Sequence, residues 1–96
     1  MKRTHNNNVA VNWSCNIESQ SHNGQFSTDG RNLFSYNQLI GITLANGDKV
    51  ALNYMSRGGG CYISNTTSQH VSKASRCADQ VMNPEVALEA GLINRI

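Results

Sequence analysis

A cysteine and a histidine are the residues of this chain whose types could supply a nucleophile and its base. Cys61 stands nine residues before His70, and a catalytic thiolate needs a nearby imidazole together with a third group that orients it. This spacing is not diagnostic. Cys61 alternates with Ile63, and Cys77 lies on an apolar helical stripe, so both thiols have the pattern of small buried hydrophobes. We therefore expect no catalytic residue, and the protein is predicted not to be an enzyme.

Metal and phosphate sites have equally weak support. A structural zinc site needs about four cysteine or histidine ligands at tight spacings, and the three cysteines and three histidines contain no CxxC, CxxH or HxxxH pair. The glycine run at residues 58–60 lacks the Lys-Ser/Thr and the helix that follow a phosphate-binding loop. The sequence thus predicts no metal and no cofactor.

Glycines and basic side chains are the candidates for binding a partner. The glycine run offers a bare backbone that a partner can approach closely, although most such runs are only turns. The basic residues that follow recur at i, i+3 and i+6 on one predicted helix, and a solvated helix face is the usual meaning of such a cluster. The predicted partner-binding residues are Arg57, Gly58, Gly59, His70, Lys73 and Arg76.

Length and composition restrict the class of protein. The 96 residues carry a net charge of only +2, whereas nucleic-acid-binding domains usually show a clustered basic face, and a DNA mimic would be acidic. No run approaches the roughly 20 apolar residues of a membrane helix, and residues 1–11 lack the apolar core of a signal peptide. We expect one cytosolic domain, residues 1–96, with a polar N-terminal arm over residues 1–8 and reduced cysteines.

The first half of the chain has the alternation of β-strands. Apolar residues occupy every second position from Val9 to Ile17, which predicts a strand with one buried face. A short strand at residues 25–28 is expected to carry Phe26 inward and to turn at Asp29-Gly30 into residues 33–36. Trp13 and Tyr36 are expected to belong to the core.

The segment from residue 40 to residue 54 permits a register argument. Apolar residues alternate on both sides of Asn46-Gly47, and a one-residue slip would move one set to the opposite face. A three-residue loop, residues 45–47 with Gly47 in the left-handed conformation, pairs Ile42 with Val50 on one face. We therefore predict that loop.

Helical spacing replaces the alternation after Ser68. A flexible connection at residues 56–60 and a strand at residues 61–64 are expected to lead to a helix capped by Thr66 or Thr67 and extending to Met82. A second helix, residues 84–90, is bracketed by Asn83-Pro84 and Gly91. The predicted fold class is α+β, an antiparallel sheet of four to five strands with two C-terminal helices packed on one face.

Three short motifs carry a resemblance to a known group of proteins. The segments NLFSYNQLIG, ANGDKVALNY and YISNTTSQHVSKA lie within residues 32–74, about half of the chain. Their pattern, Leu-x-Ser-Tyr followed later by Thr-Thr-Ser-x-His, resembles a family of small uncharacterised proteins of tailed bacteriophages. Residues 57–60 and the second helix look like additions to that pattern.

The resemblance implies a function that the residues alone do not. Small phage accessory proteins commonly act stoichiometrically on host machinery, and inhibitors of bacterial immunity such as anti-CRISPR proteins are prominent among them. The leading expectation is a non-enzymatic inhibitor in the host cytoplasm that binds a CRISPR-Cas defence complex. The alternative is a small phage nucleic-acid-binding or transcription-modulating protein. No membrane partner is expected, and homodimer formation is left open.

Overall fold

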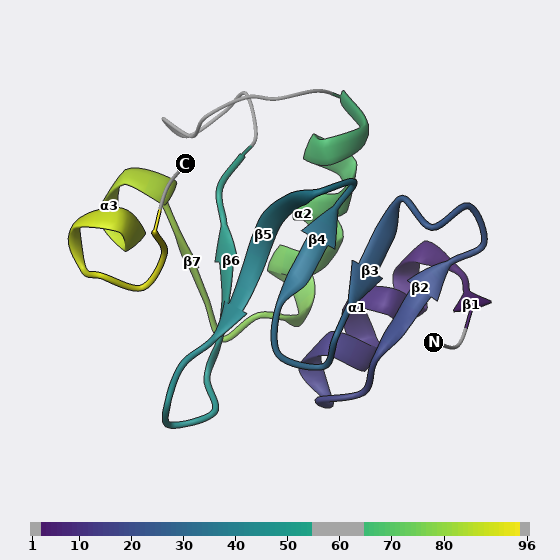
Figure 1. Cartoon of the computed structure of the whole chain (residues 1–96), viewed down its shortest axis with the longest axis horizontal. Coiled ribbons are helices and arrows are strands. Elements are labelled where there is room, and N and C mark those ends of the chain that lie inside the picture. The colour runs from purple at the N-terminus through teal and green to yellow at the C-terminus, as the bar shows by residue number, and fades with distance from the viewer. Residues whose placement is uncertain (1–2, 55–64, 95–96) are drawn as a thin grey trace.

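A seven-stranded sheet and three helices make up the described part of the chain, residues 3–54 and 65–94 of the computed structural model (Figure 1). The strands are β1 (Arg3–Thr4), β2 (Ser19–Ser21), β3 (Phe26–Thr28), β4 (Leu33–Ser35), β5 (Gln38–Thr43), β6 (Lys49–Leu52) and β7 (Gln80–Met82). The helices are α1 (Asn6–Ser14), α2 (Asn65–Cys77) and α3 (Pro84–Glu89).

The sheet is mixed, and its strands lie side by side in chain order from β1 to β7. Neighbours from β2 to β6 pair antiparallel, whereas β1 pairs parallel with β2 and β6 pairs parallel with β7. The predicted antiparallel sheet of four to five strands with two C-terminal helices is therefore wrong. Strands of two or three residues, such as β1 and β7, are too short to show a period in the sequence.

Helix α1 occupies the segment for which a strand was predicted. Val9, Ala10 and Trp13 are buried, whereas Val11 is 47% exposed and Ile17 is 50% exposed. Buried residues at i, i+1 and i+4 share one face of a helix. Over so short a segment, the apolar residues fit the two-residue period of a strand as well as the 3.6-residue period of a helix, and packing selects the helix.

Trp13 packs against β5 at Gly41. A Cβ atom at Gly41 would lie 2.8 Å from Cζ2 of Trp13 and 2.9 Å from Cβ of Leu33, so the indole can approach this closely only because the residue is glycine. The indole Nε1 donates a hydrogen bond to the Arg31 carbonyl at 2.9 Å. Trp13 is fully buried, which confirms its predicted place in the core.

The hairpin formed by β5 and β6 has the predicted register. Ile42 pairs with Val50, and the Leu44 N–H donates to the Asp48 carbonyl at 2.9 Å. Three residues remain in the loop, with Gly47 at a φ of 94°. Of the alternating apolar residues, Ile40, Ile42, Val50, Leu52 and Tyr54 are buried and Leu44 is half-buried.

Helix α2 ends at Cys77, and the chain then forms β7 instead of continuing as a helix to Met82. The Asp79 N–H donates to the Lys49 carbonyl at 2.8 Å, and Oδ2 of Asp79 accepts from the Lys49 N–H at 2.7 Å. This exchange directs the chain alongside β6, where Gln80 pairs with Val50. Backbone pairing with β6 thus overrides the helical spacing of the apolar residues.

Capping signals located α3 correctly but not the start of α2. Extended Asn83 precedes Pro84, and Gly91 follows the helix at a φ of 75°, as predicted. Thr66 and Thr67 lie inside α2, so the predicted cap is wrong. The strand predicted at residues 61–64 and the connection predicted at residues 56–60 lie outside the described residues.

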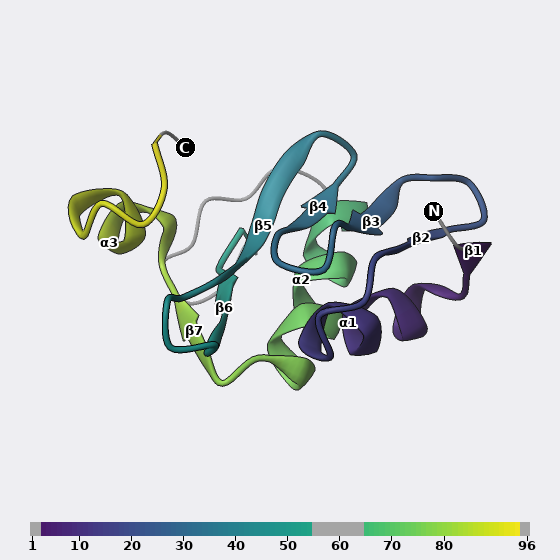
Figure 2. The same ribbon diagram turned by 60° about the horizontal axis from the view of Figure 1, so that its bottom comes forward.

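Helices α1 and α2 contact each other and lie beneath the sheet, as Figure 2 shows, whereas α3 lies beyond β7 at the far end of the molecule. Helix α1 contacts β2 and β3, and α2 contacts β5 and β6. The neighbouring pair is thus α1 and α2, not the two C-terminal helices.

Candidate functional site

The predicted partner-binding residues that the structure describes, His70, Lys73 and Arg76, differ in exposure. Arg57, Gly58 and Gly59 lie outside the described residues. His70 is buried at 3% exposure, Lys73 is half-buried, and Arg76 is exposed. The expectation that residues 70, 73 and 76 form a basic helix face is therefore wrong for His70, because the side chain of His70 faces the sheet.

His70 belongs to a buried cluster between α2 and the sheet. Its ring stacks on Phe26, with centroids 4.4 Å apart and planes 3° from parallel. Its Nδ1 lies 2.7 Å from Oγ of Ser35, which is 3.1 Å from Oγ1 of Thr67. Burial, together with a smaller effect of the Lys73 charge, lowers the pKa of His70 to about 4. The imidazole is therefore neutral at pH 7.

The Ser35–His70 pair has the atoms of a hydroxyl nucleophile and its base. Ser35 is fully buried, so its hydroxyl is not presented to a substrate from the surface of the described residues. The pair instead joins β4 to α2 within the core. Tyr36, predicted to be in the core, is 47% exposed at a φ of 55°, with its ring 6.4 Å from that of His70.

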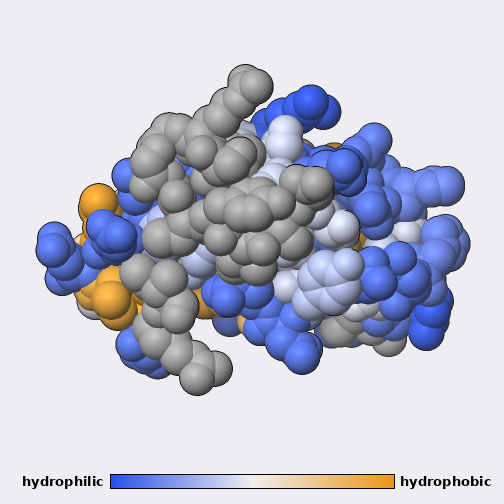
Figure 3. Space-filling model, turned by 90° about the horizontal axis from the view of Figure 1, so that it is seen from above, coloured by the Kyte–Doolittle hydropathy of each residue, from blue (hydrophilic) through white to orange (hydrophobic). Residues whose placement is uncertain are grey.

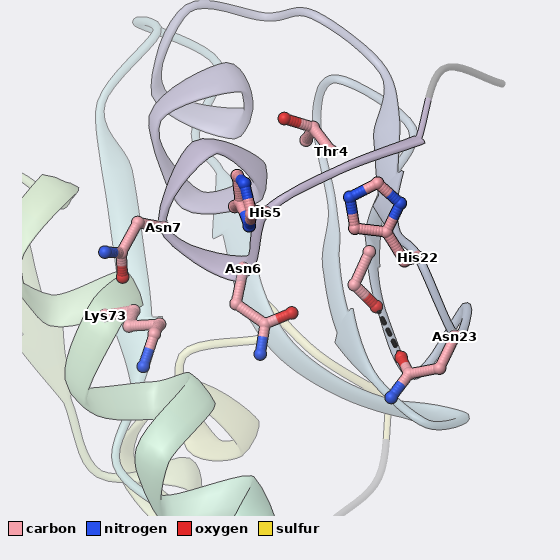
Figure 4. A pocket seen from close by; sticks show the side chains of 8 residues that line it. Thr4, His5, Asn6, Asn7, His22, Asn23 and Lys73 are labelled. Atoms are coloured by element: carbon pink, nitrogen blue, oxygen red, sulfur yellow. Dashed lines mark hydrogen bonds between the residues drawn. The ribbon is translucent and has the colours of Figure 1, made fainter.

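An open pocket of about 490 Å³ lies where the start of α1, the end of β2 and the middle of α2 meet. Figure 4 shows Lys73 and Asn7 on one side, His22 and Asn23 on the other, and His5 with Asn6 between them. We call it the histidine pocket. Its lining consists of Thr4, His5, Asn6, Asn7, Ser21, His22, Asn23 and Lys73.

A smaller pocket of about 170 Å³ adjoins the histidine pocket and shares Asn7 and Lys73 with it. Val11, Arg76 and Cys77 complete its lining, so its wall is partly apolar. Burial raises the pKa of Cys77, and the neighbouring Cys15 raises it further. Because the two pockets share residues, they form one surface feature, which we call the α1–α2 groove.

The charges of the groove have one sign. Neither pocket is lined by an aspartate or a glutamate, whereas Lys73 and Arg76 both contribute. All six acidic residues of the chain lie elsewhere, namely Glu18, Asp29, Asp48, Asp79, Glu85 and Glu89. The groove should therefore carry a positive potential although the whole chain has a net charge of only +2.

The opposite end of the molecule is apolar and acidic. Val86 and Leu88 of α3 are 50% and 39% exposed, and Glu85 and Glu89 lie on the same short helix. Figure 3 shows hydrophobic residues gathered at this end and hydrophilic residues at the other. The surface chemistry thus changes along the long dimension of the molecule.

Sequence reasoning identified Lys73 and Arg76 but missed the other residues of the groove. His5 and His22 stand in polar segments without a periodic pattern, and the parallel pairing of Thr4 with Ser21 brings them together. Their rings then pack edge to face, with centroids 5.5 Å apart. The dipeptide His-Asn occurs at residues 5–6 and again at residues 22–23, and this repetition was the available signal.

A second lysine is buried and has a structural role. Lys49 is 3% exposed. Its Nζ donates to Oγ1 of Thr43 at 2.6 Å, to Oδ1 of Asn16 at 2.8 Å and to the Gly30 carbonyl at 3.1 Å. Burial lowers its pKa, and Arg31 adds to that effect. Three uncharged acceptors use the three donors of the ammonium, so Lys49 joins the ends of α1, β3 and β5.

The described residues also bear on metal binding and on membrane insertion. Among residues 3–54 and 65–94, no group of three or more histidine, cysteine, aspartate or glutamate side chains could hold a metal ion. No helix in those ranges is both long and apolar enough to cross a membrane.

No protein family model, curated protein or solved structure matches the chain.

Proposed function

We propose that the protein is a non-catalytic inhibitor that binds a bacterial defence complex through the α1–α2 groove, which docks on an acidic protein surface. The observation that carries the docking is the charge of the groove. Lys73 and Arg76 line it, and none of the six carboxylates of the chain does. Such a surface favours a partner of negative potential.

The chemistry of the groove favours a protein over a nucleic acid. The smaller pocket has Val11 and Cys77 beside Arg76, and mixed apolar and cationic surface is typical of protein interfaces. Two cations would neutralise few phosphates, and nucleic-acid affinity depends mainly on the number of neutralised phosphates.

The identity of the target comes from the resemblance to small phage accessory proteins. Such proteins commonly act stoichiometrically on host machinery, and defence complexes of the CRISPR-Cas type are the expected targets. These complexes hold nucleic acid in basic channels, so a positively charged groove would have to bind an acidic surface outside the channel.

The test uses a panel of purified CRISPR-Cas effector complexes, each with its guide RNA. We expect one of them to bind the protein in a fixed molar ratio and to lose target-DNA cleavage. Arg76→Glu should weaken that binding by roughly tenfold or more, because it places a carboxylate in the groove. Arg31→Glu is the matched control: it makes the same charge change at an exposed residue outside both pockets, and it should change affinity by less than about twofold.

Three outcomes would contradict the proposal. Failure of every complex in the panel to bind the protein would reject the defence-complex target. Equal losses in the two variants would assign the effect to net charge and not to the groove. Tight binding to free DNA or RNA, with log affinity falling linearly with log salt concentration, would identify a nucleic-acid-binding protein instead.

A further inference from the structure

We infer that the histidine pocket binds a carboxylate group, with Lys73 as its cation and the side chains of His22 and Asn6 as hydrogen-bond donors. This inference rests on the proposed function, since the carboxylate would be an acidic side chain of the protein partner. It adds the chemical group that the groove recognises and the place where that group is held.

The framework of the pocket is fixed by contacts outside its centre. Arg3 donates a hydrogen bond to the His22 carbonyl, which ties β1 to the end of β2. Ser21 donates to Oδ1 of Asn23 at 2.7 Å, and Asn23 donates to Gln25 at 3.1 Å. The amide of Asn23 is thus committed to the turn after β2 and supports the wall of the pocket.

The hydrogen-bond donors that line the centre of the pocket have no such partners within the described residues. Within the described residues, no hydrogen bond or ion pair engages the side chains of Asn6, Asn7 or Lys73. These side chains come from α1 and α2, and His22 comes from the end of β2. The cavity of about 490 Å³ between them has room for a side-chain carboxylate and several waters.

The charge of the pocket favours a single negative charge. Among the described lining residues, Lys73 is the one permanent cation, and the other donors are amides, imidazoles and hydroxyls. Sites for phosphate dianions usually combine several cations or the bidentate fork of arginine, and no arginine lines the described part of this pocket. A metal ion is disfavoured because, among the described lining residues, no cysteine or carboxylate ligand accompanies the two imidazoles.

The test is an NMR titration of the isolated full chain with propionate, a monocarboxylate with one negative charge, and separately with inorganic phosphate, at pH 7 and constant ionic strength. We expect propionate to shift the amide signals of residues 4–7, 21–23 and 73 in a saturable manner, and phosphate to bind more weakly. Lys73→Met should weaken propionate binding by roughly tenfold, since it removes the only cation among the described lining residues of the pocket. His22→Ala should weaken it severalfold, and Arg31→Met should leave it unchanged.

Three results would overturn the inference. They are shifts spread over the surface without saturation, equal binding by Lys73→Met, and preferential binding of phosphate. The outcome is independent of the defence complex, because no partner is present in the titration. Saturable propionate binding with no complex captured would leave the pocket assigned and reject the proposed function. Capture of a complex without saturable propionate binding would reject the pocket alone.

Discussion

The imidazole of His70 lies flat on the ring of Phe26, with centroids 4.4 Å apart, while its Nδ1 contacts the Ser35 hydroxyl at 2.7 Å. The stacking and the hydrogen bond both place the imidazole in the core, where a neutral ring is favoured because protonation would bury a charge. The two contacts make this histidine part of the packing between β3, β4 and α2.

Stability should therefore decrease in mild acid. The folded-state pKa of His70 is about 4, below its ordinary value of 6.5, so the unfolded chain takes up the proton first as the pH falls. The contribution of His70 is complete above pH 6.5 and is lost progressively between pH 6.5 and about 4, by up to about 3 kcal/mol.

Urea unfolding at a series of pH values measures this effect. The control is His70→Phe, which retains a ring on Phe26 but cannot titrate. The difference in unfolding free energy between the two proteins should change across this pH range. A difference that is the same at pH 4 and pH 7 would show that His70 does not take up its proton on unfolding.

Gly41→Ala should destabilise the protein by about 1–3 kcal/mol, because the new methyl group would lie 2.8 Å from the Trp13 ring. Thermal or urea unfolding measures the loss. Trp13→Phe provides the second arm of a double-mutant cycle, since a smaller ring leaves room for the methyl group. Additive losses in the double variant would show that the two residues are not coupled.

Lys49→Met should cost about 1–3 kcal/mol of unfolding free energy, because it roughly retains the volume of the side chain but leaves the buried Gly30 carbonyl and the part-buried acceptors of Asn16 and Thr43 without their donor. Lys73→Met is the matched control: Lys73 makes no hydrogen bond within the described residues, so the loss should be below about 0.5 kcal/mol. Equal losses would contradict the structural role of the Lys49 ammonium.

Gly47→Ala should cost about 1 kcal/mol, because φ is 94° at this position and an L-residue is strained there. A Cβ atom would meet nothing within 4 Å, so the cost is purely one of backbone conformation. Gly47→Asn should be better tolerated, since asparagine adopts left-handed conformations more readily. An alanine variant as stable as the parent in urea unfolding would contradict the assigned turn.

The sequence-based predictions were accurate where residues close together in the sequence determine the structure. The β5–β6 hairpin was predicted in detail because apolar alternation on both sides of Asn46-Gly47 left only one loop length. The strand predicted from Val9 to Ile17 was wrong. Val9, Val11 and Trp13 have the spacing of one face of a strand, whereas Val9, Ala10 and Trp13 have the spacing of one face of a helix. Only packing of Trp13 on Gly41, a contact remote in sequence, decides between them.

The candidate site was predictable only on α2. Lys73 and Arg76 could be found because helical spacing marks exposed positions. His5 and His22 could not be placed together, because their proximity depends on the parallel pairing of β1 with β2. Strand β1 has two residues, too few to show a pattern in the sequence. Parallel strands are also not joined by a tight turn, whose residues would have marked the pairing.

The pairing of β1 with β2 also bears on how long the pocket persists. Local openings of a fold require less free energy where few backbone hydrogen bonds must break. The wall of the pocket that carries His5 can thus detach by fraying of Arg3 and Thr4, while Trp13 and the strands beneath it stay in place. Amide exchange at Arg3 and Thr4 should accordingly occur through local opening and be much faster than in the core. A carboxylate bound in the pocket would slow this exchange by stabilising the closed arrangement.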